Sequence, residues 1–211
     1  MLDSSMLVNS PILLFSIIFA IGYLLGSIPF GILLTRFAGL GDLKKIGSGN
    51  IGATNVLRTG SKSLAAATLF LDTSKAVAAV IVAQTLTSGS ASQIAGLVAG
   101  AGAVLGHDFS IWLKFKGGKG VATSLGMMIA TTPLIGGMAC VTWVGMAIVF
   151  RYSSLSALIA LAIAPVFAII LGLTNATLVY AAIAVLGWTR HWTNIKRLYT
   201  GDEPRIGEPN V

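Results

Sequence analysis

Charged side chains are scarce in this chain. Asp, Glu, Lys and Arg make up 10% of the 211 residues, whereas hydrophobic residues make up 55% and the mean hydropathy is +0.87. A soluble domain carries roughly a quarter charged residues, because its surface faces water. A protein dissolved in a bilayer has no such need, since its outer surface faces lipid. The composition therefore excludes an ordinary soluble domain and indicates a membrane protein.

The chain also has a single cysteine, no cluster of metal-ligand residues and no basic N-terminal segment. The lone Cys140 excludes an intramolecular disulfide, and its apolar surroundings favour core packing over a catalytic thiol. No group of His, Cys and carboxylate residues has the spacing of metal ligands, so we expect neither a metal nor a cofactor. No Lys or Arg precedes Pro11, and no small-residue cleavage pattern follows Leu25. We therefore expect an uncleaved first span rather than a secretory signal.

Alternating hydrophobic stretches are few, which favours helices over an outer-membrane barrel. The sequence predicts an all-α membrane protein with about seven transmembrane helices in a single domain, 1–211. The fourth apolar run is shorter than the about 20 residues of a full span. It either begins inside a re-entrant or loop-shielded cavity or fuses with the fifth run through Pro133. The seven runs are 11–37, 63–87, 92–106, 121–131, 133–150, 155–172 and 175–189.

Lys and Arg residues fall on alternate connections between these runs. The connections 87–92, 132–133 and 172–175 contain none, whereas the other connections and the C-terminal stretch contain nearly all of them. The positive-inside rule then predicts the N-terminus outside and the C-terminus in the cytoplasm. Because the net charge of +7 is spread over these loops, we expect a membrane surface or an anionic substrate rather than nucleic acid. Function is expected at the cytoplasmic face.

The first cytoplasmic loop contains Gly47, Gly49 and Gly52 in the spacing G-x-G-x-x-G. A dinucleotide site is excluded because no strand precedes Gly47 and no βαβ unit fits between membrane spans. Glycines nevertheless let backbone amides approach an oxyanion. The alternative is a flexible loop of turn residues. The polar neighbours that would complete an anion site are Ser48, Asn50, Thr54, Asn55 and Arg58.

The second cytoplasmic segment, 114–120, runs directly into the fourth apolar run. It is not a Walker A loop, because Val121 stands where Ser or Thr is required. Membrane anchoring would explain Lys114 and Lys116 but not the glycines between the lysines. The residues expected to form an anion cradle ahead of the helix are Gly117, Gly118, Lys119 and Gly120.

Two further cytoplasmic segments carry polar residues. In 151–155, Ser153 or Ser154 should cap the next helix, and Ser154 is also a candidate for substrate contact. In 190–203, His191 and Asn194 lie at i,i+3 if the seventh helix continues. The alternative for this last stretch is a basic amphipathic anchor at the membrane surface.

Ionisable residues inside apolar runs are expected to be structural. Asp72 and Lys75 lie three residues apart in the second run, and mutual pairing would offset the cost of placing each charge in lipid. His107 and Asp108 are adjacent in sequence, and on a helix their side chains point about 100° apart. We therefore favour a structural role for them over an acid–base pair.

These segments together resemble the bacterial acyl-phosphate:glycerol-3-phosphate acyltransferase family. The resemblance extends from about residue 11 to Glu203, with four motifs in the family's order and spacing. Each motif is weak alone, but four in order on a chain with seven apolar runs are highly specific. The motifs are Gly47-Ser-Gly-Asn-Ile-Gly-Ala-Thr-Asn55 with Arg58, Gly106-His107 with Lys116-Gly-Gly-Lys-Gly-Val-Ala122, Arg151-Tyr-x-Ser-Leu155, and His191-x-x-Asn-Ile-x-Arg-Leu-x-x-Gly-x-Glu203.

The resemblance implies a reaction in the bacterial cytoplasmic (inner) membrane. A fatty acyl group would pass from acyl phosphate to the 1-hydroxyl of sn-glycerol 3-phosphate, giving lysophosphatidate and phosphate, an early step of phospholipid biosynthesis. The implied partners are these substrates, membrane lipid and a soluble enzyme that produces acyl phosphate. The His-x4-Asp arrangement of thioester-dependent acyltransferases is missing, because Trp112 lies five residues after His107 and Lys196 five after His191.

Acyl phosphate is an activated anhydride, so positioning and charge stabilisation can lower much of the barrier. In the implied mechanism, Ser48, its neighbouring amides and the 117–120 loop hold the acyl-phosphate group, and five side chains hold glycerol 3-phosphate: Arg58, Lys119, Ser154, His191 and Asn194. The hydroxyl proton passes either to the substrate phosphate or to His191 as general base. The implied catalytic residues are Ser48, Arg58, Lys119, His191 and Asn194; the implied substrate-binding residues are Gly47, Gly49, Asn50, Asn55, Gly117, Gly118, Gly120 and Ser154.

A different functional class remains open from the sequence. A membrane transporter of anions or phosphate esters would also use glycines and basic residues near broken helices. It predicts polar groups at the bilayer midplane and internal repeats, and neither is clear in this chain.

Overall fold

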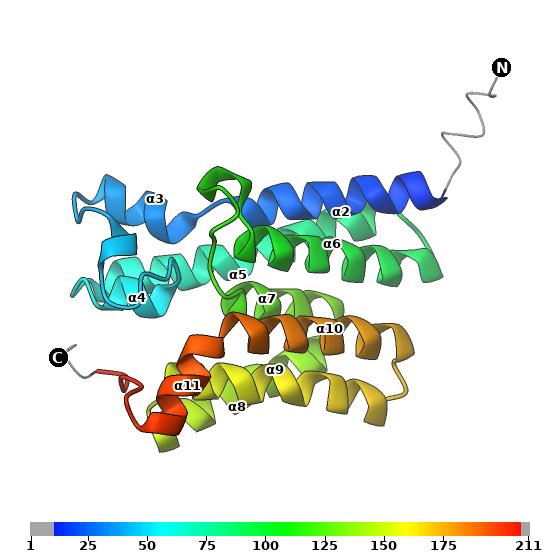
Figure 1. Cartoon of the computed structure of the whole chain (residues 1–211). Helices are drawn as coiled ribbons and strands as arrows, with labels where there is room; N and C mark the ends of the chain where they lie inside the picture. Colours follow the sequence, from blue (N-terminus) through cyan, green and yellow to red (C-terminus); the bar gives the residue numbers. More distant parts are fainter. Residues whose placement is uncertain (1–10, 208–211) are drawn as a thin grey trace.

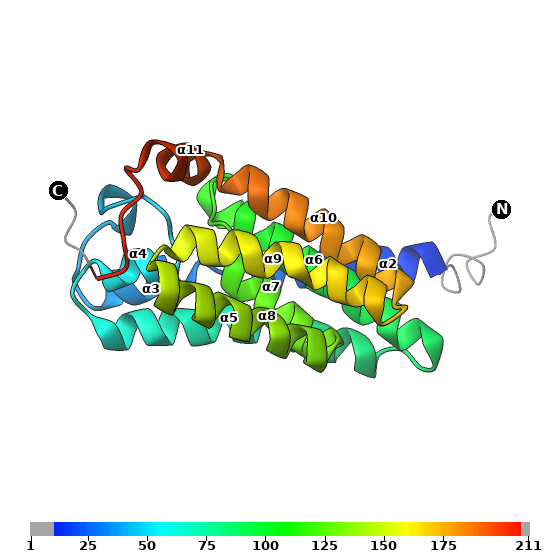
Figure 2. The same ribbon diagram turned by 90° about the horizontal axis from the view of Figure 1, so that it is seen from below.

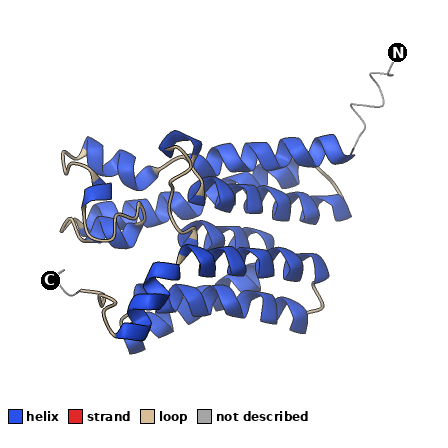
Figure 3. Cartoon of the chain, viewed as in Figure 1, coloured by secondary structure: helices blue, strands red, loops and turns tan. Residues whose placement is uncertain are grey.

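The computed structural model describes residues 11–207, which form helices and loops without a β-strand among them (Figure 3). The ends of the predicted domain, 1–10 and 208–211, lie outside the described residues. The helical part of the predicted fold class is thus confirmed. The long helices are α2 (Pro11–Ser27), α5 (Lys62–Thr85), α6 (Ser90–Asp108), α7 (Val121–Thr131), α8 (Pro133–Phe150), α9 (Ser153–Ile170) and α10 (Thr174–Arg190). The short elements are α3 (Phe30–Phe37), η1 (Leu43–Lys45), α4 (Ala53–Leu57), η2 (Ile111–Leu113) and α11 (Trp192–Thr200).

Each predicted apolar run corresponds to helix, but not all helices have the length of a span. Among the described residues, five segments are long and apolar enough to cross a membrane: Pro11–Phe37, Lys62–Thr85, Ser90–Leu113, Pro133–Phe150 and Ser153–Ile170. The other two are shorter, because α7 has 11 residues and α10 has 17.

The long helices run roughly along a common direction in two groups (Figures 1 and 2). Helices α2, α5 and α6 form one group, α8, α9 and α10 form the other, and α7 lies between them. The α3–α4 region and α11 lie at one end of the bundle, whereas the short α5–α6 and α9–α10 links lie at the opposite end. The chemically rich loops, far apart in sequence, are therefore brought to the same end.

Small residues allow α2 and α6 to pack with their backbones in contact. A Cβ atom on Gly22 would lie 2.2 Å from the carbonyl oxygen of Ala99, and one on Gly26 would lie 2.0 Å from that of Ala103. From the other side, a Cβ on Gly106 would lie 2.1 Å from the carbonyl oxygen of Tyr23. Larger side chains would force the helices apart, as in other membrane interfaces built from small residues.

The first apolar run is broken at Pro29, which separates α2 from α3. Proline lacks an amide hydrogen and disfavours helical geometry at the preceding residue. The break exposes the carbonyl of Ile28, and the ammonium of Lys75 donates a hydrogen bond to this oxygen at 3.0 Å. The same ammonium donates to the Asp72 carboxylate at 2.8 Å, which confirms the predicted structural pair.

The fourth and fifth runs form a tight hairpin. Fusion through Pro133 was one of two alternatives, and it is wrong: α7 ends at Thr131, and α8 begins at Pro133. A Cβ on Gly136 would lie 2.4 Å from the backbone nitrogen of Ile129, so the two helices fold closely against each other. The buried N-cap Gly120 and the adjoining cavity agree with the alternative of a shielded helix start.

Candidate active site

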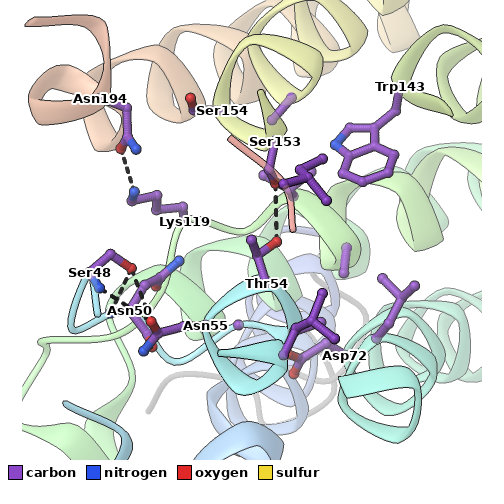
Figure 4. Close-up of a pocket in the computed structure, with 18 of the residues that line it drawn as sticks. Ser48, Asn50, Thr54, Asn55, Asp72, Lys119, Trp143, Ser153, Ser154 and Asn194 are labelled. Atoms are coloured by element: carbon purple, nitrogen blue, oxygen red, sulfur yellow. Dashed lines mark hydrogen bonds between the residues drawn. The ribbon is translucent and has the colours of Figure 1, made fainter. Parts of the chain in front are cut away.

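A cavity of about 640 Å³ lies where the motif loops meet (Figure 4). Its polar part is lined by the first loop and α4, by the start of α7, by the start of α9 and by α11 with the segment that follows. The cavity continues between α5, α7 and α8, where its apolar lining includes Leu69, Leu125, Ile129, Trp143 and Val144. It therefore joins a polar compartment to an apolar groove.

Asn55 holds the first loop together. This side chain is almost completely buried, and its Nδ2 donates to three backbone carbonyls, those of Leu43, Ile46 and Asn50. Its Oδ1 accepts a bond from the Ser48 amide at 3.2 Å. The loop is thus an ordered structure rather than the flexible turn segment of the alternative interpretation.

Gly47 makes room for Arg58 in this loop. Its φ is +51°, a region that favours glycine, and a Cβ there would lie 2.7 Å from the Arg58 side chain. The guanidinium lines the cavity, and burial lowers its pKa although the charge of Glu203 opposes this shift. The guanidinium nevertheless keeps its charge at neutral pH.

Lys119 lies at the edge of a polar network, where it contacts Asn194 (Figure 4). Its Nζ donates to Oδ1 of Asn194. The Asn194 amide nitrogen then donates to Oε1 of Glu203 at 2.6 Å, and the Ser154 hydroxyl donates to the same oxygen at 2.6 Å. Arg197 donates to Oε2 of Glu203 at 2.8 Å. Four elements of the chain are therefore joined through one carboxylate and one amide.

Two charges of this network have shifted pKa values. Burial lowers the pKa of Lys119 to about 8, against the attraction of Glu203 and with the repulsion of Arg197 and other cations. Burial alone would raise the pKa of Glu203, but hydrogen bonds from Ser154, Asn194 and Arg197 outweigh it and lower that pKa.

His191 marks a break between two helices. The i,i+3 placement of His191 and Asn194 was conditional on a continuous seventh helix, and this condition is not met, because α10 ends at Arg190 and α11 begins at Trp192 with a changed direction (Figure 2). His191 Nδ1 lies 2.7 Å from the carbonyl oxygen of Gly187. Since a carbonyl only accepts, Nδ1 carries the proton, and Nε2 of the neutral ring is an acceptor. Burial lowers the pKa of His191 to about 4, so the ring is neutral at pH 7.

The predicted site residues divide into two groups. Those that line the cavity are Ser48, Asn50, Asn55, Arg58, Lys119, Gly120, Ser154, His191 and Asn194. Gly47, Gly49, Gly117 and Gly118 are not among the lining residues. The amides of Gly117 and Gly118 donate to the carbonyls of Asp108 and His107, so they are engaged within the protein.

The expectation of a serine cap on α9 is wrong. The N-cap residue is Tyr152, without a side-chain cap bond. Ser154 donates to Glu203 instead, and the Ser153 hydroxyl lies 3.0 Å from that of Thr54 (Figure 4). Both serines therefore connect the start of α9 to other parts of the site.

Sequence reasoning gave no role to Glu203, which lines the cavity, or to Arg190, which contacts the turn before Lys119. Glu203 belonged to a recognised motif but had no role, and its links to Ser154 and Asn194 depend on the tertiary fold. One signal was available, because Glu203 is an acidic residue within a basic segment. Arg190 donates to the carbonyl of Gly118, a contact between residues far apart in sequence. No group of three or more potential metal ligands occurs within residues 11–207.

Comparison with known proteins assigns the chain to a family. The family model described as "Glycerol-3-phosphate acyltransferase" matches residues 16–201. The chain belongs to the glycerol-3-phosphate acyltransferase family. A protein of this name from Rhodospirillum rubrum is 55% identical over 201 residues, which cover 93% of each chain. One from Agrobacterium fabrum is 54% identical, covering 89% of this chain and 90% of the other. The resemblance predicted from the motifs is confirmed.

Two solved structures share the fold of this acyltransferase. Both are of PlsY, described as an integral membrane glycerol 3-phosphate acyltransferase. Its glycerol 3-phosphate form has a TM-score of 0.85 at 35% identity, covering 92% of this chain and 96% of that one. Its lysophosphatidic acid form has a TM-score of 0.83 at 35% identity, covering 92% and 95%. Together with the apolar helices, this likeness identifies the acyltransferase as a multi-pass membrane protein.

The charges of the acyltransferase cavity suit an anionic substrate. Arg58, Lys119 and Arg205 line it, and its acidic residues are Glu203 and Asp72. Glu203 is engaged by Arg197, and Asp72 by Lys75. The polar compartment therefore presents an excess of positive charge beside hydroxyl and amide groups, a combination that binds phosphate.

Proposed function

We propose that this enzyme transfers a fatty acyl group from acyl phosphate to the 1-hydroxyl of sn-glycerol 3-phosphate. The products are lysophosphatidate and inorganic phosphate, which makes the reaction an early step of phospholipid biosynthesis. Membership of the family makes the chain a glycerol-3-phosphate acyltransferase. The identity of the donor is the further part of the proposal, and the whole chain would act as one membrane domain.

The observation that carries the proposal is the continuity of the cavity. Its polar compartment is cationic, and its apolar groove lies between α5, α7 and α8. Leu69 and Val144 in the groove are each 50% exposed, which in a bilayer means contact with lipid. A donor with a phosphate head and an acyl tail fits both parts at once, and its tail can enter from the membrane.

The polar side chains suggest a division between two phosphate groups. Ser48 and the backbone beside it would hold the acyl-phosphate group. Lys119 and Arg58 would bind the phosphate of glycerol 3-phosphate, with Asn194 and Ser154 beside it. The glycines at 117 and 118 would support Lys119 instead of binding phosphate, because their amides already donate to α6 carbonyls.

The chemical step then needs little from the protein beyond positioning and charge. The 1-hydroxyl oxygen attacks the acyl carbonyl carbon, and the bond between this carbon and the phosphate oxygen breaks. The departing phosphate keeps the electron pair and takes the hydroxyl proton. Ser48 and the backbone beside it would stabilise the negative charge on the departing phosphate, while Lys119 and Arg58 hold the phosphate of glycerol 3-phosphate.

The geometry of His191 favours orientation over proton abstraction. Its Nε2 can accept a hydrogen bond from the substrate hydroxyl, because Nδ1 donates to Gly187. A base with a pKa of about 4 takes a proton poorly at neutral pH. We therefore assign the proton to the phosphate and the placement of the hydroxyl to His191.

A single assay tests the proposed reaction. Purified protein in detergent or vesicles receives acyl phosphate and glycerol 3-phosphate, and both phosphate release and lysophosphatidate formation are followed. We expect equal amounts of the two products, dependence on the acceptor and activity that survives a metal chelator. Robust turnover with acyl-CoA as sole donor, and none with acyl phosphate, would contradict the proposal. Glycerol 3-phosphate uptake into vesicles without acylation would instead support a transporter.

A groove variant tests the position of the acyl tail. Ile129→Trp would fill part of the groove, whereas Ile148→Trp adds the same bulk on α8 at a residue that is 74% exposed and does not line the cavity. We expect Ile129→Trp to raise the KM for long-chain acyl phosphate several-fold and to spare short-chain donors. Equal behaviour of the two variants toward all chain lengths would remove the groove from the proposal.

The proposed topology places both glycine-rich loops in the cytoplasm of the bacterial inner membrane, where a soluble enzyme would supply acyl phosphate. It rests on the segregation of Lys and Arg among the loops. In a Cys140→Ala background, we expect Ser90→Cys and Asn175→Cys to react with an impermeant maleimide in intact cells. Lys62→Cys and Lys116→Cys should react only after the cells are opened. All four residues are exposed, so a reversed pattern would overturn this orientation.

A further inference from the structure

The turn at Gly117 and Gly118 lies directly on the end of α6. The Gly117 amide donates to the Asp108 carbonyl at 3.1 Å, and the Gly118 amide donates to the His107 carbonyl at 2.9 Å. A Cβ on Gly118 would lie 2.1 Å from Nε2 of the His107 ring. A Cβ on Gly117 would instead meet the His107 backbone oxygen, also at 2.1 Å. Side chains are therefore excluded at both positions by protein atoms.

Arg190, the last residue of α10, holds the same turn. Its Nη2 donates to the Gly118 carbonyl at 2.8 Å, and its Nε donates to this oxygen at 3.1 Å. Nη2 also reaches the Asp108 carbonyl at 3.2 Å. The guanidinium lies over the Phe109 ring, 5.1 Å from its centre. One planar group thus ties the turn to the end of α6.

The His107 ring is itself held in place by a hydrogen bond at Nδ1. Its Nδ1 lies 2.9 Å from the Lys75 ammonium, which also bonds to Asp72 and to the Ile28 carbonyl. An ammonium only donates, so Nδ1 accepts this bond and Nε2 carries the ring proton. All three side chains are buried. The His107 ring that Gly118 contacts is therefore held by charge-assisted bonds to α5 and, through Lys75, to the link between α2 and α3.

We propose that Arg190 and His107 are positioning residues that hold the Gly117–Gly118 turn between α10 and α6 and thereby fix the Lys119 ammonium at the anion site. The inference rests on the proposed function, in which Lys119 binds a substrate phosphate. A lysine side chain is flexible, so an ordered turn at its base limits the positions that its ammonium can reach. Neither residue needs to touch substrate for this role.

A double-mutant cycle tests the His107 contact. Gly118→Ala should lower kcat/KM at least tenfold, because the new methyl group meets the ring. Adding His107→Ala should recover several-fold of that loss, since it removes the obstructing atoms. Gly117→Ala is the matched control, because its methyl group meets a backbone oxygen that His107→Ala leaves in place. No recovery in the Gly118 pair, or equal recovery in both pairs, would overturn the role of His107.

Chemical rescue tests Arg190. Arg190→Ala should raise the KM for glycerol 3-phosphate about tenfold and change kcat less than about threefold. Added guanidinium should restore the KM, whereas sodium chloride at equal ionic strength should not. Arg36→Ala, at an exposed position in the last turn of α3, should behave as wild type with and without guanidinium. Unchanged constants for Arg190→Ala, or a loss that guanidinium does not reverse, would overturn its role.

A stability readout separates this inference from the proposed reaction. If the wild-type protein does not acylate glycerol 3-phosphate, the proposed function fails. The Gly118–His107 contact can still be measured. Gly118→Ala should lower the melting temperature of the wild-type protein, and it should lower the melting temperature of the His107→Ala variant by less. Purely additive shifts in melting temperature would overturn the contact independently of activity.

Discussion

The two glycine-rich loops of this acyltransferase look alike in sequence, yet they use glycine for different physical reasons. In the first loop, Gly47 and Gly49 adopt positive φ values of +51° and +67°, and the turn that they form places Ser48 at the cavity. In the second loop, Gly117 and Gly118 have no positive φ and are required by close contact with α6, and among the glycines of this loop only Gly120, at the start of α7, has a positive φ, of +68°. The first loop depends on its own backbone turn, whereas the Gly117–Gly118 part of the second loop depends on close packing against α6.

The loops also differ in the kind of cation that they carry. Arg58 belongs to the first loop and offers a planar fork with a permanent charge. Lys119 belongs to the second and offers a compact ammonium whose pKa burial lowers to about 8. A glycine pattern alone therefore does not reveal whether backbone conformation, close packing or a charged side chain makes the site.

The largest expected effect separates Lys119 from Lys114 in the second loop. Lys119→Ala removes a charge-assisted contact worth about 1.5–3 kcal/mol, so activity should fall about 10- to 150-fold. Lys114→Ala should lose little, because Lys114 is exposed and its charge is screened. Lys119→Arg should also be largely inactive, since a planar fork cannot replace a compact ammonium beside Asn194.

Specific activity at matched folded yield measures this comparison. Equal and mild losses for Lys114→Ala and Lys119→Ala would leave only an anchoring role for the second loop. An active Lys119→Arg variant would show that charge alone matters there, and the contrast between the two cations would disappear.

A smaller effect is expected from glycine in the first loop. Gly47→Ala would place a methyl group 2.7 Å from the Arg58 side chain, and we expect about a tenfold loss of activity from displacement of the guanidinium. Gly39→Ala is the control, because Gly39 also has a positive φ but nothing within 4 Å of its Cβ position. Both variants carry the strain of about 1–2 kcal/mol for a left-handed alanine.

Kinetics and melting temperatures of Gly47→Ala and Gly39→Ala together distinguish the Arg58 contact from backbone strain. Both variants should lose stability, Gly47→Ala more, because its methyl group would also lie 2.7 Å from Oδ1 of Asn55, and only Gly47→Ala should lose activity. If Gly39→Ala is equally impaired in activity, backbone strain rather than the Arg58 contact explains the first loop.

Patterns local in sequence predicted a large part of this molecule. Apolar runs located the helices, because a bilayer demands about 20 apolar residues per span. The segregation of Lys and Arg predicted that the motif loops share one side, and the structure brings them to one end of the bundle. Nine of the thirteen predicted site residues line the cavity, because side chains suited to phosphate are recognisable individually.

What sequence could not predict depends on contacts between distant residues. The break at Pro29 is tolerated because Lys75, on another helix, donates to the exposed carbonyl. Glu203 accepts hydrogen bonds from Ser154 and Asn194, and nothing in the sequence around either residue indicates this contact. Gly117 and Gly118 matched a phosphate-loop pattern. Only the fold shows that their amides donate hydrogen bonds to the carbonyls of Asp108 and His107.

The smallest expected effect is a pH dependence that distinguishes the two cations. Lys119 is charged below its pKa of about 8 and neutral above it, so kcat/KM for glycerol 3-phosphate should fall as pH rises through this value. The loss should be about twofold at pH 8 and about tenfold at pH 9. A bound phosphate favours the charged ammonium, so the corresponding fall in kcat should lie at higher pH. Arg58 keeps its charge throughout this pH range and therefore adds no further change to the profile of kcat/KM against pH.

This profile also tests the assignment of the proton. Rates are measured at constant ionic strength and corrected for donor hydrolysis without enzyme at each pH. His191, with a pKa of about 4, should add no limb between pH 5 and 7, whereas substrate phosphate ionises near pH 6 in every variant. A limb near pH 6.5 that disappears in His191→Asn would make His191 the general base. A profile that stays flat from pH 7 to 10 would mean that Lys119 does not titrate in the free enzyme, and the two loops would then carry equivalent permanent charges.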